Sequence, residues 1–515
     1  MAAITVKPIS RLLVHKCSCY RPGLFSRVTR LWRLAPGCER RIAFVIALAV
    51  FAACQGIQAQ TLNVRIVVGS TAPARIRINA EFPKPTDVIS FPNAYGGVLG
   101  LAERIENVEA RASGGQVISV RKLAPGEFQT SERLNQISYE VNLSEPMPPA
   151  QGSHVSWLNR EQGLLMLSDL LPRSIKGQSA FSSVLVKLDL PPGFVSASNS
   201  DRQDALTYLS DEPDKAVFLI GSQLHQQSRH LGAKDFSVVL SGDWPILDKD
   251  ALKIAGQIVQ EYSKLTGFDL KRNAVLMLVP FPGDAGPERW TAETRGNGVV
   301  LLLGQRGSRR QISSRLGIVL AHEIFHLWVP NALKLEGDYD WFFEGFTIYQ
   351  ALRMDLRLHL ISFADYLDTI ARVHDSYLSS PDRENLSLIQ ASERRWTTSS
   401  TLVYDKAMLV AFLYDLQLRS TSGCKASLAD VYRQLFQRFT TGQAGANETI
   451  IGVLNEQLGQ QSFAQQYIEG RGIINLVSAL SPYGISVRQT SSGTKLSVQP
   501  TDKVQKKVLN CLARN

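Results

Sequence analysis

The chain has 515 residues, of which 44% are hydrophobic and 20% are charged. This composition is typical of a globular protein and excludes a disordered or fibrous one, and the length predicts about three domains. The net charge of +10 arises in residues 1–60, which hold nine Lys and Arg residues and one acidic residue. The rest of the chain carries 47 basic and 45 acidic residues, so it lacks the basic excess expected of a nucleic-acid-binding protein.

The first 60 residues have the pattern of a secretory signal peptide. Arg40 and Arg41 precede an apolar run of twelve residues over 42–53, which is too short to span a bilayer comfortably. We therefore expect an exported protein, periplasmic or secreted, without a transmembrane span in the mature chain. An organellar transit peptide is the alternative for this Arg-rich leader. Cys54 offers a lipid anchor, and the late apolar run also leaves open a start downstream of Met1.

Only Cys424 and Cys511 remain after removal of this leader. In an oxidising compartment they could form one disulfide, and two separate thiols are the alternative. Neither has a neighbouring CxxC or CxxH partner, which argues against a cysteine-ligated metal site.

The pattern of hydrophobic residues changes near Phe236. Over 61–235 the chain shows short alternating runs broken by Gly, Pro, Asn and Ser, which is typical of an antiparallel β-sandwich-like domain. The elements predicted after it are a strand over 236–240, a helix over 249–265, strands over 274–280 and 299–303, a long helical stretch from Leu316, and helices over 404–418 and 427–439.

The motif that carries chemistry is His322-Glu323-Ile324-Phe325-His326, an HExxH sequence on this long helical stretch. We expect the helix to be capped by Ser313 or Ser314 and stopped by Pro330. On a helix, His322 and His326 lie on one face, one turn apart, so both can ligate one metal ion. Glu323 lies about 100° away and can act as general base on a water bound to that metal.

Zinc in a hydrolytic site needs a third protein ligand, and Glu344 in the segment 341–349 is the candidate. A helical hairpin turning at Pro330-Asn331 would bring it back to the histidines. The sequence therefore predicts one Zn²⁺ bound by His322, His326 and Glu344, with no other cofactor. Ile348, four residues after Glu344, offers no carboxylate to orient a ligand histidine, so Glu336, Asp338 and Asp340 in the connecting loop are the candidates for that role.

With these residues in place, the chain resembles the glycyl aminopeptidase-type gluzincins, which are distant relatives of the aminopeptidase N family. The segment 343–349 is similar to the Glu-Gly-x-Thr-x-Tyr segment of the family, and 404–415 is similar to its Tyr-x-Lys-Gly helix. The resemblance implies that Tyr404 stabilises the oxyanion of the transition state. It also implies a carboxylate for the free amine of the substrate, for which Glu293, one position off the expected place, is the candidate. No room remains after these motifs for the PDZ domain of many relatives.

Together these features predict an α+β multidomain protein. Its parts are a leader over 1–60, an N-terminal β-sandwich-like domain over 61–235, a thermolysin-like zinc catalytic domain over 236–400 and a C-terminal helical domain over 401–515. The expected function is zinc-dependent peptide-bond hydrolysis, of the aminopeptidase type, with the substrate between an edge strand near Val299 and the metal helix. The alternative is a non-catalytic peptide-binding or scaffold protein on the same fold.

Overall fold

The computed structural model describes residues 61–173, 181–395, 399–441 and 444–514. The predicted signal peptide and Cys54 lie outside the described residues. Among the described residues, no helix is both long enough and apolar enough to cross a membrane.

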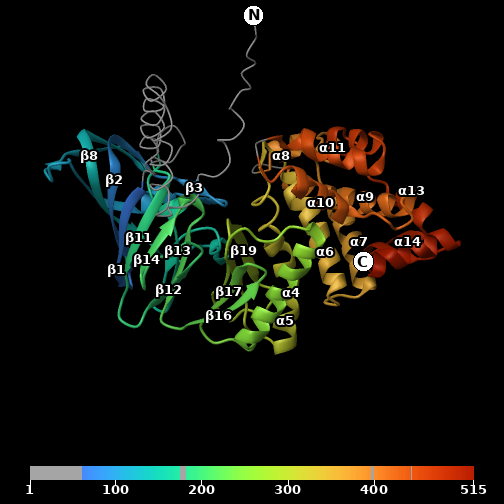
Figure 1. Cartoon of the computed structure of the whole chain (residues 1–515), viewed down its shortest axis with the longest axis horizontal. Coiled ribbons are helices and arrows are strands. Elements are labelled where there is room, and N and C mark those ends of the chain that lie inside the picture. The colour runs from blue at the N-terminus through green and yellow to red at the C-terminus, as the bar shows by residue number, and fades with distance from the viewer. Residues whose placement is uncertain (1–60, 174–180, 396–398, 442–443, 515) are drawn as a thin grey trace, which may run out of the picture. The chain divides into compact units, whose positions relative to one another are not determined.

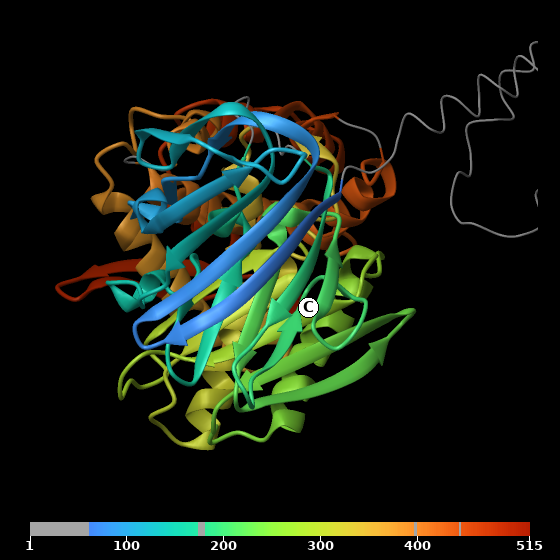
Figure 2. The same cartoon turned by 90° about the vertical axis from the view of Figure 1, so that its left-hand side faces the viewer.

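The N-terminal part packs two sheets against each other, as the alternating pattern predicts. In β1 (Thr61–Thr71) every second side chain from Leu62 to Val68 is buried. This strand lies inside a sheet of nine strands ordered β13-β14-β11-β1-β2-β8-β5-β6, with β7 beside β8 (Figure 2). The other strands of this sheet are β2 (Ala74–Ser90), β5 (Ile105–Arg111), β6 (Val117–Ile118), β7 (Val120–Ala124), β8 (Glu127–Asn142), β11 (Ser183–Asp189), β13 (Asp201–Arg202) and β14 (Thr207–Ser210).

A four-stranded sheet, ordered β12-β15-β10-β9, covers the inner face of this large sheet. Its strands are β9 (Trp157–Leu158), β10 (Gln162–Met166), β12 (Val195–Ser198) and β15 (Val217–Gly221). All five residues of β10 and of β15 are buried, because Leu165 and Phe218 point into the sandwich core while Leu164 and Leu219 point into a second core on the opposite face.

That second core joins the four-stranded sheet to a five-stranded sheet that carries the functional region. Its order is β16 (Leu224–Leu231), β17 (Lys234–Ser241), β18 (Ala274–Pro280), β20 (Gly298–Leu303) and β19 (Trp290–Arg295). Strands β17, β18 and β20 are parallel and nearly fully buried, whereas β19 runs antiparallel at the edge. The predicted edge strand near Val299 is therefore wrong: β20 has partners on both sides, and β19 is the edge.

Helices α4 (Asp248–Thr266) and α5 (Arg309–Phe325) cover the other face of this sheet. The capping residue of α5 is Ser308, whose hydroxyl accepts a hydrogen bond from the amide of Gln311, and not Ser313 or Ser314. The helix ends at Phe325, five residues before Pro330, so the predicted stop at the proline was also placed too late.

The remaining chain is mostly helical, as predicted from Leu402 onward, and its helices gather together in Figure 1. They are α6 (Thr347–Arg357), α7 (Phe363–Ser379), α8 (Leu388–Glu393), α9 (Ala407–Thr421), α10 (Leu428–Arg438), α11 (Ala446–Leu458), α12 (Ser462–Ala464), α13 (Leu476–Leu480) and α14 (Lys503–Arg514). The hairpin of β23 (Ile485–Thr490) and β24 (Gly493–Val498), which packs on α7, was not expected.

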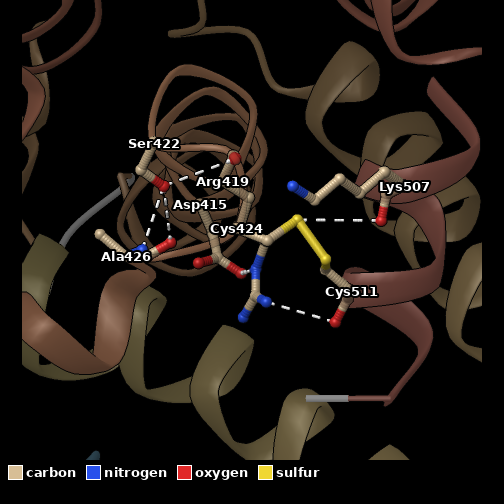
Figure 3. The surroundings of a disulfide bond; sticks show 7 residues. All are labelled: Asp415, Arg419, Ser422, Cys424, Ala426, Lys507 and Cys511. Carbon is tan, nitrogen blue, oxygen red and sulfur yellow. Dashed lines mark hydrogen bonds and ion pairs between the residues drawn. A yellow bond between two sulfur atoms is a disulfide. The ribbon is translucent and has the colours of Figure 1, made fainter. Parts of the chain in front are cut away.

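Cys424 and Cys511 form a disulfide that ties α14 to the end of α9 (Figure 3). Beside it, Arg419 donates a hydrogen bond to the carbonyl oxygen of Cys511 and pairs with Asp415. Residues 60–515 form one compact unit, so the three-part division of the chain at 235/236 and 400/401 stays a prediction.

Candidate active site

His322, His326 and Glu344 converge into a single candidate metal group among the described residues. The two Nε2 atoms lie 3.1 Å apart, and the Oε2 atom of Glu344 lies 3.6 Å from that of His322 and 3.7 Å from that of His326. A tetrahedral zinc ion about 2.0–2.1 Å from each ligand would separate the ligand atoms by roughly 3.3 Å. The donor set and its spacing therefore fit zinc.

The outer nitrogens of the two histidines differ in their surroundings. The Nδ1 of His326 lies 2.8 Å from the carbonyl oxygen of Val329, which leaves Nε2 free to ligate. The Nδ1 of His322 is buried and has no hydrogen-bond partner among the described residues, in keeping with the apolar Ile348. Burial and the neighbouring His326 hold the pKa of His322 well below its ordinary value, so this imidazole is neutral, as a metal ligand must be.

The loop carboxylates do not orient the histidines. Glu336 and Asp338 are exposed, and Asp340 pairs instead with Arg395 at 2.5 Å between Oδ1 and Nη1. The same guanidinium donates through Nη2 to the Oε1 atom of Glu344 at 2.8 Å. One oxygen of Glu344 thus faces the histidines while the other is held by Arg395.

Glu344 and Tyr404 both lie on π-helical turns. Glu344 belongs to η5 (Trp341–Phe346), which runs into α6, and Tyr404 belongs to η6 (Leu402–Lys406), which runs into α9. The Nη2 atom of Arg395 lies 2.5 Å from the hydroxyl oxygen of Tyr404, so the phenol is within two hydrogen-bond lengths of the Glu344 carboxylate. Burial and the charge of Glu344 raise the pKa of Tyr404, which keeps its hydroxyl protonated and able to donate.

Glu323 is buried beside the metal group. The hydroxyl of Thr294 on β19 lies 2.9 Å from its Oε2 atom and 2.8 Å from its carbonyl oxygen. Burial raises the pKa of this carboxyl to about 7, and the Thr294 hydrogen bond opposes that rise. A carboxylate with a pKa near neutrality can both accept and return a proton.

These groups line one cavity of about 640 Å³ between the edge strand β19 and the helices. Trp290, Ala292, Glu293 and Thr294 form its strand wall. Arg395 and Phe343 form part of the opposite wall, with the guanidinium over the Phe343 ring. The unpaired edge of β19 is where an extended peptide could add as a further strand.

Glu293 lines this cavity although it lies one position off the place expected from the family resemblance, and β19 pairs with β20 in continuous register. Its carboxylate lies 2.5 Å from the hydroxyl of Tyr95 on β3 (Ala94–Tyr95), 2.6 Å from the Nδ1 of His154 and 3.0 Å from the Nε of Arg295. The N-terminal part of the chain thus supplies two of these groups, Tyr95 from a short strand and His154 from a turn.

The sequence interpretation missed several of these groups. Arg395, Thr294, Tyr95 and His154 belong to no motif and lie far from the HExxH segment in the chain. The sequence does contain an indication of β19. Gly296-Asn297 lies between two runs of strand-forming residues, which is typical of a tight hairpin turn, and Gly296 adopts a φ of 56° in that turn.

The HExxH motif together with a distant glutamate is the donor set of gluzincin-type metallopeptidases, and this chain is similar to them in that respect. Residues 316–410 match the sequence model of the M61 glycyl aminopeptidase family, a segment that contains both histidines, Glu323, Glu344 and Tyr404. This match confirms the predicted resemblance to the glycyl aminopeptidase-like gluzincins and supports a peptidase.

Solved structures share the fold. An aminopeptidase N family protein from Idiomarina loihiensis superposes with a TM-score of 0.72 at 19% identity over 84% of this chain and 79% of that one. A mutant M1 zinc metallopeptidase from Deinococcus radiodurans, bound to a Tyr-Ser-Ala substrate, gives a TM-score of 0.51 at 13% identity over 81% of this chain and 95% of that one. No curated protein matches the sequence significantly.

Proposed function

We propose that this chain is a zinc-dependent peptidase of the aminopeptidase type. The observation that carries the proposal is the convergence of His322, His326 and Glu344 in one cavity with the buried carboxyl of Glu323. Their spacing suits a tetrahedral ion, and an HExxH histidine pair with a distant glutamate is the donor set of hydrolytic zinc sites.

Each reacting group has a role that follows from its surroundings. When bound, zinc supplies a Lewis acid that polarises the scissile carbonyl and lowers the pKa of the attacking water. Glu323, buried beside the metal group in the same cavity, takes the proton of that water and returns it to the leaving amine. Tyr404 donates its hydroxyl proton in a hydrogen bond to the oxyanion, because its raised pKa keeps it neutral.

Glu293 is the proposed anchor for the free amine of the substrate. It lines the cavity, its side chain is 15% exposed, and it accepts from or pairs with three neighbours. A carboxylate offers about four acceptor positions, so one is left for an ammonium group. Tyr95, His154 and Arg295 would fix its orientation, which favours cleavage next to a free N-terminus over cleavage within a peptide.

The disulfide supports an exported location. Disulfides persist in oxidising compartments, and Cys424–Cys511 joins residues 87 positions apart. We therefore propose that residues 1–60 direct export to the periplasm or beyond. Separately, we propose that residues 61–235 form a β-sandwich domain, residues 236–400 a catalytic domain and residues 401–515 a helical domain.

The test compares hydrolysis of N-terminally free and N-acetylated peptides by the purified protein. We expect zinc at one ion per chain, cleavage of free peptides only, and loss of cleavage with a chelator or with Glu323→Gln. Glu336→Gln removes an exposed carboxylate of the connecting loop and serves as the matched control that keeps activity. Zinc-loaded protein that cleaves no peptide would favour a peptide-binding scaffold instead, and equal cleavage of acetylated peptides would make it an endopeptidase.

A further inference from the structure

Beyond the metal group, the active-site cavity is also lined by residues of α5, α6, α7 and α9, and the part of the cavity that these residues line is called the branch. On α6, Ile348, Leu352 and Asp355 line it at helical spacing, following on from Glu344. On α5, Ile318 and Val319 line it one turn before His322. Because the chain reverses between α5 and α6 at the metal group, both walls extend from that group in the same direction.

Two further helices complete the apolar walls of this branch. Val373 and Thr369 of α7 lie one turn apart, and Met408 of α9 lies one turn after Tyr404. The branch is therefore lined by aliphatic side chains and Met408, apart from Thr369 and the carboxyl of Asp355 at the far end of the α6 face.

The buried carboxyl of Asp355 is expected to lower the stability of the fold. It is 3% exposed, and its Oδ1 atom has no hydrogen-bond partner among the described residues. Burial alone raises its pKa well above the ordinary value. An unpartnered buried carboxyl destabilises a fold, so its presence at the lining of an active-site cavity indicates a binding role.

The geometry points to this branch as the subsite for a substrate side chain with an apolar stem and a terminal ammonium group, received by Asp355. Ile348 and Asp355 are separated by seven helical residues, about 10 Å along the axis, so a lysine-length side chain held beside the metal group spans much of the branch. Its methylene stem would lie along the aliphatic walls while the ammonium meets the carboxyl. This inference rests on the proposed peptidase function for the orientation of the substrate.

The test uses pairs of free peptides that carry lysine or norleucine at one of the two positions flanking the scissile bond. Norleucine has the same four-carbon stem without the ammonium group. We expect a preference for lysine of about tenfold or more in kcat/KM at one of these positions, abolished by Asp355→Leu. Asp355→Asn, which keeps the shape and removes the charge, should reduce the preference, and Asp243→Asn, at an exposed loop position, should leave it unchanged.

A binding measurement separates this inference from the peptidase proposal. In Glu323→Gln protein, calorimetry with the same peptides should show tighter binding of lysine than of norleucine, and Asp355→Leu should remove the difference. Selective binding without hydrolysis by the wild-type protein would keep the subsite and refute the peptidase. If Asp355→Leu leaves the lysine-to-norleucine ratio unchanged, both in kcat/KM and in binding affinity, the subsite is refuted while the peptidase proposal stands.

Discussion

Gly345 packs so closely against Ala407 that a side chain at position 345 would overlap the Cβ atom of Ala407 and approach the carbonyl oxygen of Val403 to 2.6 Å. This contact joins the two π-helical turns that carry Glu344 and Tyr404. The close contact at Gly345 thus helps to set the distance between the proposed metal ligand Glu344 and the proposed oxyanion donor Tyr404.

Gly345→Ala should therefore weaken the fold and the site together. We expect a loss of about 1–3 kcal/mol in the free energy of unfolding, as for other overpacked cores, and a lower affinity for zinc because η5 must shift. Urea denaturation and zinc titration measure the two effects. Adding Ala407→Gly removes the Cβ atom that overlaps and should recover part of both losses. Recovery should be incomplete because the new side chain still lies too close to the Val403 carbonyl oxygen. Unchanged zinc affinity in Gly345→Ala would contradict the expectation that a shift of η5 weakens the metal group.

Arg395 is expected to position both Glu344 and Tyr404. Arg395→Met removes the hydrogen bonds to both residues, so zinc affinity or kcat should fall by about 10- to 100-fold, as for other residues that hold metal ligands. Arg395→Lys keeps the charge but loses the forked geometry and should recover only part of the loss. Arg438→Met, which breaks the exposed ion pair with Glu456, is the control for loss of an arginine. Unchanged zinc affinity and kcat in Arg395→Met would argue against a positioning role.

The placement of His322 and His326 on one face could be predicted from the sequence because it depends on local helical geometry. His326 lies one residue past the end of α5, but its backbone keeps a right-handed helical conformation with φ −64° and ψ −17°, so the i, i+4 relationship to His322 is preserved. The sandwich-like pairing of the first strands follows from hydrophobic periodicity in the same way, as do β17, α4, β18 and β20, whereas β19 was not predicted.

What could not be predicted depends on contacts between distant segments. The π-helical turns η5 and η6 pack against each other, and nothing in residues 341–346 or 402–406 marks them in the sequence. Arg395 reaches Glu344 across 51 residues, and His154 reaches Glu293 across 139. The strand order that makes β19 the edge also depends on which parallel strands meet, which periodicity does not determine.

Lys406 should destabilise the protein at neutral pH. Its side chain is fully buried, its Nζ has no hydrogen-bond partner among the described residues, and burial lowers its pKa from 10.5 to about 8. Below pH 8 the folded state must bury an ammonium group. From about pH 8 to 10.5 the unfolded chain binds more protons than the folded one, so this cost fades as pH rises.

Lys406→Met should therefore be more stable than the wild type at pH 7, by on the order of 2–3 kcal/mol, and its advantage should shrink as pH rises through the range 8 to 10.5. Urea denaturation at a series of pH values measures this difference. Lys253→Met, at an exposed position of α4, should change stability little at any of them. A Lys406→Met protein less stable than the wild type at pH 7 would mean that the ammonium group has a favourable role in the fold.

The Cys424–Cys511 disulfide should hold α14 in place. Arg353 and Arg419, both buried, donate hydrogen bonds to the carbonyl oxygens of Leu512 and Cys511, so release of α14 would leave two buried guanidinium groups with fewer partners. The double variant Cys424→Ser, Cys511→Ser should lose about 2–5 kcal/mol of stability. Its C-terminal helix should become sensitive to limited proteolysis.

Thermal unfolding with and without a reductant gives the internal control for this prediction. Reductant should lower the Tm of the wild type toward that of the double variant and should leave the Tm of the double variant unchanged. Arg353, which contacts α14, lies on α6, and α6 follows directly on the turn that carries Glu344. Release of α14 should therefore disturb Glu344 and lower the affinity for zinc as well as the stability. A double variant with wild-type Tm and wild-type zinc affinity would show that packing of α14 alone, through Val508, Leu509 and Leu512, is sufficient to hold it.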